Sequence, residues 1–340
     1  MLKTNAFVHK KKLFRFYFLL YFANFFKCLI ISIFKCYINT LKKNKAMIKR
    51  TLFFGNKTSL TTKFEQLLVK TEERKTTIPI EDIGFVVLEH PEIYISIPTL
   101  TKLSENNVAV IFCNAKHMPC SMLLNLDNHY IQQELFTNQI NASLPLKKQL
   151  WQQTIKTKIN NQAQHLAVQN KPFKVLKHFE EKVVSGDTTN MEAASAAYYW
   201  KNLFDFDFKR ERYGDYPNLF LNYGYIILRA AVSRALAGSG LLSTLGIHHH
   251  NKYNAFCLAD DIMEPYRPLV DAKVVEIIKN YNEPELTTAI KAELLQVLTQ
   301  TVYFEDTQSP LMVALTKTTS SLQQCFAGKE RKIKYPNLWN

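Results

Sequence analysis

A run of three histidines followed by a short acidic stretch is the part of this sequence best suited to chemistry. His248–His250 is followed within sixteen residues by Asp260, Asp261 and Glu264, and Glu192 lies upstream in the segment TTNMEAASAAYYWKNLF. Divalent cations that act on phosphates prefer hard oxygen ligands, sometimes with one imidazole. These residue types therefore predict a cation site in which one histidine meets a carboxylate from the following helix, with Glu192 supplied by another helix.

The same residues also have purely structural interpretations. Thr189-x-x-Glu192 fits a capping box, in which Glu192 would only close the start of its own helix. Asp260 and Asp261 fit a solvent-exposed helix start, where negative charge is favourable, and surface histidines often have no role. The residue pattern by itself leaves both interpretations open.

The second part of the chain has helical spacing, and its helices must position most of the candidate acidic residues. Apolar side chains recur every three or four residues in LPLKKQLWQQTIKTKINNQAQHLAV and in LNYGYIILRAAVSRALAGSG, where Gly238 is placed to end a helix. Asp261 and Glu264 lie three residues apart, so on a helix they share one face, and the histidines precede that helix in a loop. We expect a larger all-α domain over 128–330 and a short tail over 331–340.

Strand signals dominate the preceding part of the chain, from Met47 to Asp127. The segment TTIPIEDIGFVVLEH has β-branched residues around a turn and then a continuous apolar run, as a buried strand would, and VAVIFC is a second such run. A short helix is expected over 98–106, with proline at its start. The sequence thus predicts an α+β fold, with a small mainly-β domain over 47–127 followed by the helical domain.

The first 46 residues differ in composition from the rest. They hold ten of the 43 basic residues and none of the 29 acidic ones, which leaves 33 and 29, a net charge of +4, for the remainder. Three interpretations stay open for residues 1–46: upstream sequence translated before a true start at Met47, a membrane or surface anchor, or a signal segment. We favour the first, because the residue set is narrow and Met47 begins a plausible domain.

Composition bounds the class of protein further. The chain has 340 residues, is 47% hydrophobic and carries a net charge of +14, which allows a large core and is compatible with a polyanionic partner. Its six cysteines form no C-x-x-C pair, which favours a reducing, cytoplasmic location over a disulfide framework or zinc ribbon. A phosphate-binding P-loop, a G-x-S-x-G elbow, a dinucleotide fingerprint and an H-E-x-x-H zinc motif are all absent from the sequence.

Several longer segments carry a resemblance to a known family. They are GD…N-x-E-A (186–193), LNYGYIILRA (221–230), GIHHHN (246–251), NAFCLADDIMEPYRP (254–268) and SPLMVAL (309–315). From Met47 onward the chain resembles the CRISPR-associated protein one family of spacer-acquisition integrases. Its motifs are most similar to those of the branch found in type II systems. The resemblance implies an N-terminal β domain and a C-terminal helical catalytic domain.

The resemblance also implies a set of ligands for Mg²⁺ or Mn²⁺. The family glutamate of the N-x-E motif falls on Glu192, the family histidine three residues after a glycine falls on His249, and the glutamate of D-[IL]-M-E-P falls on Glu264. His248 and Asp261 are expected as supporting residues, Asp261 from one helical turn earlier. The histidine run departs from the simplest family pattern, so the choice of His249 over His248 needs a direct test.

By the same resemblance, the chain is expected to be a metal-dependent DNA endonuclease and integrase. A 3′-hydroxyl of a short foreign fragment would attack a phosphodiester at a repeat boundary of a CRISPR array. The implied partners are double-stranded DNA, a second copy in a homodimer, a small ferredoxin-like subunit of the CRISPR-associated protein two family and type II effector proteins, with no membrane partner. A non-catalytic DNA-binding scaffold and a membrane-anchored nuclease are the alternatives.

Overall fold

The structure is a computed structural model, and it describes only part of the chain. The described ranges are 49–125, 129–212, 214–281, 284–305 and 307–339. The chain divides into two units, Met1–Met47 and Ile48–Asn340. Residues 1–46, for which three interpretations were offered, lie outside the described ranges. Within those ranges, no helix combines the length and apolar character needed to cross a bilayer.

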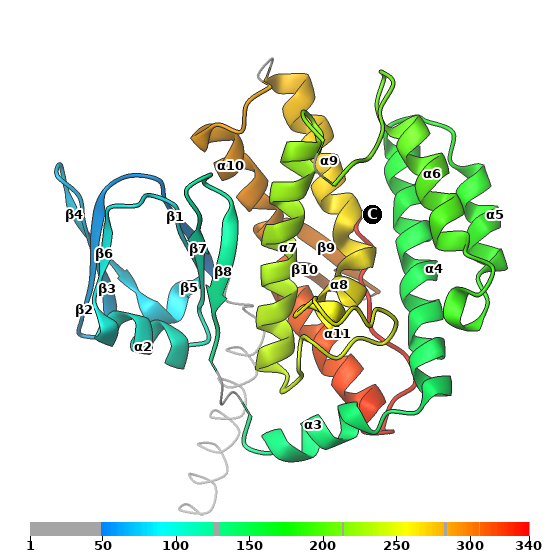
Figure 1. Cartoon of the computed structure of the whole chain (residues 1–340), viewed down its shortest axis with the longest axis horizontal. Helices are drawn as coiled ribbons and strands as arrows, with labels where there is room; N and C mark the ends of the chain where they lie inside the picture. The colour runs from blue at the N-terminus through cyan, green and yellow to red at the C-terminus, as the bar shows by residue number, and fades with distance from the viewer. Residues whose placement is uncertain (1–48, 126–128, 213, 282–283, 306, 340) are drawn as a thin grey trace, which may run out of the picture. The chain divides into compact units, whose positions relative to one another are not determined.

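The first sheet is built around a fully buried central strand. Its strands run in the order β1-β5-β7-β8 (Figure 1), with β1, β5 and β7 parallel and β8 antiparallel to β7. All six residues of β5 are buried, as expected for a continuous apolar run covered on both faces. The bounds are β1 Arg50–Phe54, β5 Ile83–Leu88, β7 Ala109–Cys113 and β8 Pro119–Leu123.

A second sheet, in the order β4-β3-β2-β6, and one helix complete the β region. Leu60 and Leu67 from this sheet, Val86 and Val110 from the first, and Leu103 from the helix share one core. The sheets therefore bury their apolar faces in a common interior. The bounds are β2 Thr58–Lys63, β3 Gln66–Lys70, β4 Lys75–Pro79, β6 Ile93–Ile95 and α2 Ile97–Glu105.

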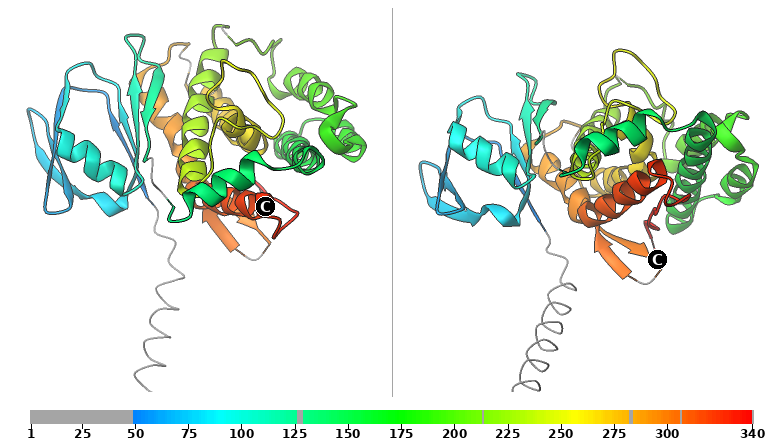
Figure 2. Two further views of the ribbon diagram at one scale, coloured as in Figure 1. Left: turned by 60° about the horizontal axis from the view of Figure 1, so that its bottom comes forward. Right: turned by 90° about the horizontal axis from the view of Figure 1, so that it is seen from below.

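The remainder of the described chain is mostly helical (Figures 1 and 2). The long helices α4 and α7 pack against α9, and α7 also packs against α8 and α11. Phe85 and Val87 of β5 join this helical core, so the two regions share buried contacts. The bounds are α3 Gln132–Ile140, α4 Leu144–Val168, α5 Lys174–Lys182, α6 Met191–Leu203, α7 Asn218–Gly238, α8 Cys257–Met263, α9 Arg267–Asn280, α10 Thr288–Leu295 and α11 Leu311–Phe326.

A β-hairpin interrupts the region expected to be all helical. Strands β9 (Thr301–Phe304) and β10 (Thr307–Pro310) pair antiparallel between α10 and α11. The β-branched and aromatic run TVYF favours a strand, but four residues are too few to give a clear periodic signal. The α+β class is confirmed, whereas the all-α description of its second part is wrong at this hairpin.

Candidate functional site

Helix α6 begins in a way that leaves the Glu192 carboxylate available. The amides of Met191 and Glu192 donate to Asp187 Oδ1 and Oδ2 at 3.0 and 2.9 Å, so Asp187 caps the helix from the preceding turn. Glu192 itself accepts from Lys158 Nζ at 2.7 Å. The capping-box interpretation is therefore wrong for Glu192, whose side chain points across to α4.

The histidine loop is fastened to the carboxylate of Asp261. This side chain is fully buried, and its Oδ2 accepts the amides of Ile247 and His248 at 2.7 and 2.9 Å. Its Oδ1 accepts the His249 amide at 3.3 Å and lies 2.6 Å from His249 Nδ1. Asp261 is thus no solvated helix-start residue: it fixes both the loop backbone and the His249 ring.

The ring of His249 is oriented so that its second nitrogen can act as an acceptor. A carboxylate at Nδ1 favours the proton on that atom, which leaves Nε2 with a free lone pair. The hydrogen bond to Asp261 raises the pKa of His249 and outweighs the opposing effect of burial. The imidazole therefore loses its proton at a higher pH than an unperturbed histidine does.

Glu264 follows α8 directly and is almost completely buried. It begins a single 3₁₀ turn, Glu264–Tyr266, before α9, and its carboxylate pairs with Lys158 Nζ at 2.6 Å and with Arg267 at 2.9 Å. Burial raises the pKa of Glu264, but Arg267 and Lys158 together hold it below its usual range. Glu264 is accordingly a charged carboxylate in a largely dry environment.

Lys158 connects the two glutamates. Its Nζ contacts Glu192 and Glu264 at once, although the three residues come from α4, α6 and the turn after α8. Burial lowers the pKa of Lys158, yet attraction to Glu264 and Glu192 outweighs it and leaves that pKa above its ordinary value. The two expected ligands therefore converge on one buried positive charge.

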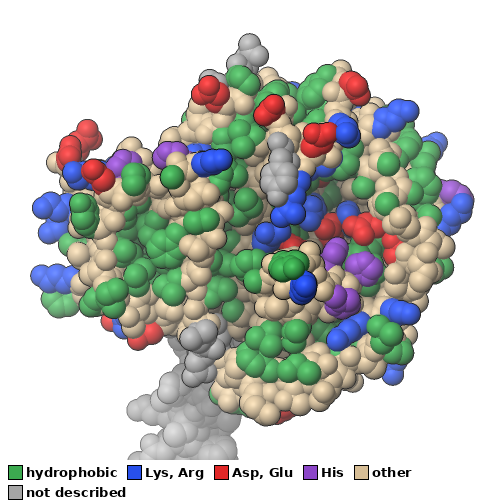
Figure 3. Space-filling view, in the orientation of Figure 1, with side chains coloured by type: hydrophobic (Ala, Val, Ile, Leu, Met, Phe, Trp, Pro, Cys, Tyr) green, Lys and Arg blue, Asp and Glu red, His purple; other side chains and the backbone are tan. Residues whose placement is uncertain are grey.

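The other two histidines have different surroundings. The His248 ring stacks on Trp151 with a centroid separation of 4.1 Å and an interplanar angle of 1°, and burial lowers its pKa. His249 meets the same indole edge-on, and all three histidines are exposed to solvent, His249 with 45% of its side chain. On the face drawn in Figure 3, histidine, acidic and basic side chains adjoin around a hollow. The middle histidine has the ring orientation that suits a ligand, and His248 packs beside it.

The donor types present fit Mg²⁺ or Mn²⁺, although the described residues hold no ready cluster of three or more metal-binding side chains. Two carboxylates and one imidazole nitrogen are suitable ligands for such ions. Glu264 Oε2 is buried and has no hydrogen-bond donor in good geometry, only the ion pair with Lys158. A buried oxygen in that state is suited to a cation.

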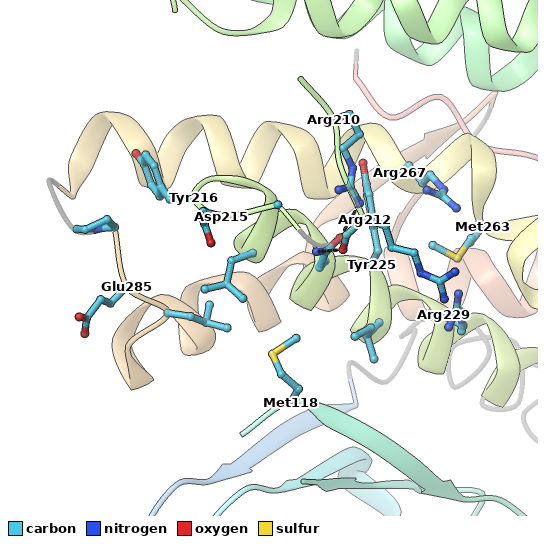
Figure 4. Close-up of a pocket in the computed structure, with 16 residues that line it drawn as sticks. Met118, Arg210, Arg212, Asp215, Tyr216, Tyr225, Arg229, Met263, Arg267 and Glu285 are labelled. Atoms are coloured by element: carbon cyan, nitrogen blue, oxygen red, sulfur yellow. Dashed lines mark hydrogen bonds between the residues drawn. The ribbon is translucent and has the colours of Figure 1, made fainter. Parts of the chain in front are cut away.

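A cleft of about 890 Å³ adjoins this cluster and is rich in arginine. Arg210, Arg212, Arg229 and Arg267 all line it (Figure 4), and Arg267 is the residue that also pairs with Glu264. Met118, Leu219, Ile226 and Leu286 contribute apolar lining. A cleft with several guanidinium groups and an apolar wall is suited to a phosphate chain with attached bases.

A buried carboxylate supports one side of the cleft. Asp271 accepts hydrogen bonds from Tyr225, which lines the cleft, and from Tyr199, whose hydroxyl also meets His165. Arg267 lies over the Tyr225 ring, 4.7 Å from its centroid. Burial raises the pKa of Asp271 to about 7, against the opposing effect of the two tyrosine hydrogen bonds.

Sequence reasoning missed several residues of this site. Lys158 had a signal, because it falls on the apolar face of its helix, three residues after Ile155, where a lysine needs a buried partner. The only sequence signal for Arg267 was its position close to the D-x-M-E-P motif.

Comparison with known proteins agrees with this architecture. A family model described as CRISPR associated protein Cas1 matches residues 52–295. The CRISPR-associated endonuclease Cas1 of Neisseria meningitidis serogroup C (strain 8013) is 36% identical over 296 residues, which cover 86% of this chain and 97% of that protein.

Two solved structures share the fold. One belongs to a Cas6-RT-Cas1–Cas2 complex (TM-score 0.66, 19% identity, 86% of this chain and 36% of that longer chain), and the other is a casposase bound to integration product (TM-score 0.65, 19% identity, 84% and 92%). The family-model match over most of the chain, together with the 36% identity to the Neisseria protein, shows that this chain belongs to the CRISPR-associated Cas1 family.

Proposed function

We propose that this chain is a metal-dependent DNA endonuclease and integrase of CRISPR adaptation, which joins short foreign fragments to a repeat array. The observation that carries the proposal is the convergence of Glu192 and Glu264 on one cation position, beside a His249 ring oriented by Asp261. The names of the relatives support the same activity. The Neisseria protein is called an endonuclease, and a casposase of the same fold is bound to an integration product.

The proposed reaction is a transesterification without a covalent protein intermediate. The 3′-oxygen of the fragment forms a new bond to phosphorus, while the bond from that phosphorus to the 3′-oxygen of the target strand breaks. The attacking hydroxyl loses its proton and the departing 3′-oxygen gains one, so the number of phosphodiester bonds is conserved. With water in place of the 3′-hydroxyl, the same site would act as an endonuclease.

Glu192, His249 Nε2 and Glu264 would hold a Mg²⁺ or Mn²⁺ ion. Such an ion, when bound, polarises the phosphate and stabilises charge on the oxygens that attack and leave. Asp261 keeps the His249 ring in the required tautomer, and Asp187 keeps Glu192 at the start of α6. Burial of Glu264 excludes water from one side of the site.

The arginine-lined cleft would hold the DNA strand next to these ligands. Its guanidinium groups would bind phosphates largely without regard to sequence, which implies affinity that falls with added salt. Arg267 is positioned to link the two parts, since it lines the cleft and pairs with Glu264. Double-stranded DNA, a second copy of this chain and a Cas2 subunit are the proposed partners, the last supported by the fold shared with a Cas1–Cas2 complex.

The proposal is tested by strand transfer of a labelled fragment with a free 3′-hydroxyl into a plasmid that carries repeats. Glu192→Ala, His249→Ala and Glu264→Ala are each expected to abolish transfer in Mg²⁺ or Mn²⁺ while most DNA affinity remains. Loss of transfer in the wild-type chain on removal of divalent ions completes the test. Full activity in Glu192→Ala or His249→Ala would contradict the ligand assignment, and DNA binding without any transfer would favour a non-catalytic scaffold.

A further inference from the structure

Lys158 occupies the point between the two glutamates that a cation would take. Its Nζ lies 2.7 Å from Glu192 Oε1 and 2.6 Å from Glu264 Oε2, and only 9% of its side chain is exposed. Lysine is almost never buried without a partner, and this one lies on the buried face of α4 with Ile155 and Gln162. The fold has therefore placed an ammonium group inside the acidic cluster.

The two carboxylates depend on this ammonium to different degrees. Glu264 has a second cationic partner in Arg267, at 2.9 Å, whereas Lys158 is the one cation paired with Glu192 among the described residues. Without a positive charge between them, two neighbouring carboxylates repel each other and disfavour their charged forms. Lys158 thus holds Glu192, on α6, close to Glu264, which lies on a separate element.

We propose that Lys158 is the resident cation of the metal-free site, and that a divalent ion binds by displacing its ammonium from between Glu192 and Glu264. This inference rests on the proposed function, in which those two residues are metal ligands. The ammonium and the ion carry charges of the same sign and need the same oxygens, so both cannot be held there together. Lys158 is a positioning residue: it keeps the ligands together before the ion arrives.

Competition between the Lys158 ammonium and the ion predicts a result that would not be expected if Lys158 were only structural. Replacing Lys158 by an uncharged side chain leaves two facing carboxylates in the metal-free protein, which destabilises that state. An incoming ion then relieves their repulsion and no longer has to displace a bound cation. The loss of Lys158 should therefore weaken the metal-free fold and at the same time tighten metal binding, whereas loss of a true ligand weakens metal binding.

The test has two measurements on the full chain. A titration with Mn²⁺ alone, monitored by calorimetry, gives the affinity, and thermal melting with and without Mn²⁺ gives the stability. Lys158→Met retains most of the side-chain volume without the charge, and Lys158→Gln is a second uncharged variant. Lys156→Met is the matched control, because Lys156 is two residues earlier on the same helix and makes no ion pair within the described ranges. Glu192→Ala serves as the variant that loses a ligand.

The expected result is a metal-free melting temperature below that of the wild type and a Mn²⁺ affinity about tenfold tighter for both Lys158 variants. Mn²⁺ should also raise their melting temperatures by more than it raises that of the wild type. Lys156→Met should match the wild type in both measurements.

Unchanged or weaker Mn²⁺ binding in Lys158→Met and Lys158→Gln would overturn the inference. Variants that stay unfolded even at saturating Mn²⁺ would overturn it too, because the ion would then not replace the ammonium. A wild-type chain that binds no Mn²⁺ would instead refute the proposed metal site itself, so the two failures are distinguishable.

Discussion

Asp261→Asn tests the most connected side chain of the site. The carboxylate accepts three backbone amides and faces His249 Nδ1, and it is fully buried. Asparagine keeps one acceptor oxygen but presents an NH₂ group to donors where the second oxygen was. One pair of donors, the amides of Ile247 and His248, uses Oδ2, and the other pair, the amide and Nδ1 of His249, uses Oδ1. With a single oxygen, at least one of these pairs is left without an acceptor.

The size of the effect follows from the hydrogen bonds that the substitution removes. A hydrogen bond to a charged group contributes about 1.5–3 kcal/mol, so the removal of two costs about 3–6 kcal/mol of unfolding free energy. For a chain of this size that corresponds to a fall in melting temperature of roughly 6–10 °C. Because the His249 ring also loses its orienting partner, Mn²⁺ affinity should fall by about 10–100-fold.

The same substitution should change the pH dependence of metal binding. The hydrogen bond to Asp261 raises the pKa of His249, and the imidazolium form cannot bind a metal ion. Binding to the wild-type chain should therefore weaken as the pH falls through that raised pKa. In Asp261→Asn the pKa of His249 drops, so the acid limb of the binding curve moves to lower pH.

Thermal melting and Mn²⁺ calorimetry across pH 5–9 measure these effects. Asp207→Asn is a suitable control, since Asp207 is exposed in the segment between α6 and α7. If Asp261 were only a solvated residue at a helix start, its substitution would change stability by no more than about 0.5 kcal/mol. A melting temperature within about 2 °C of the wild type, with unchanged Mn²⁺ affinity, would refute the reasoning.

Three further predictions follow from other parts of the site. His248→Ala should retain most strand transfer and lose some stability, because His248 stacks on Trp151; an inactive His248→Ala beside an active His249→Ala would move the ligand by one residue. Arg212→Ala should weaken DNA binding similarly for unrelated sequences and reduce the slope of log affinity against log salt by about 1; an unchanged slope would remove Arg212 from the phosphate contacts. Asp271 has its pKa raised to about 7 in the folded chain, so it binds a proton more tightly there than in the unfolded chain. As the pH rises from about 4 to 7, its contribution to the free energy of unfolding therefore falls by about 1.4 kcal/mol per pH unit. Asp271→Asn should flatten this slope in thermal melts across that range, and a slope equal to that of the wild type would contradict the assignment.

Long amphipathic segments were the most predictable part of the fold. The apolar spacing of LPLKKQLWQQTIKTKINNQAQHLAV coincides with α4, Leu144–Val168, and the run VAVIFC contains β7. Both elements bury enough side chains for the period to be visible in the sequence alone. The hairpin β9–β10 was missed because each strand is only four residues long, too short for an alternating pattern to be visible.

The site was predictable as a set of residues but not as an arrangement. The resemblance pointed to Glu192 and Glu264, and the structure brings both to one point on Lys158, a residue that no motif marks. Local sequence also suggested that Glu192 caps its own helix, but Asp187 takes that role from outside the S/T-x-x-E pattern. The arginine-lined cleft joins residues that are far apart in the chain, so no local pattern could indicate it.

The way the histidine loop is tied down limits how this loop can vary among descendants of the gene. A β-carbon at Gly246 would lie 2.4 Å from the His249 carbonyl oxygen and 2.8 Å from Asp261 Oδ2, so any larger residue there would push the loop off its anchor. Asp261 accepts hydrogen bonds from the amides of residues 247–249, and every residue except proline supplies such a main-chain donor at 247 or 248. The number of residues between Gly246 and His249 is therefore under stronger constraint than the identity of those between them. A substitution at position 248 can therefore add or remove a histidine without moving His249, which faces Asp261.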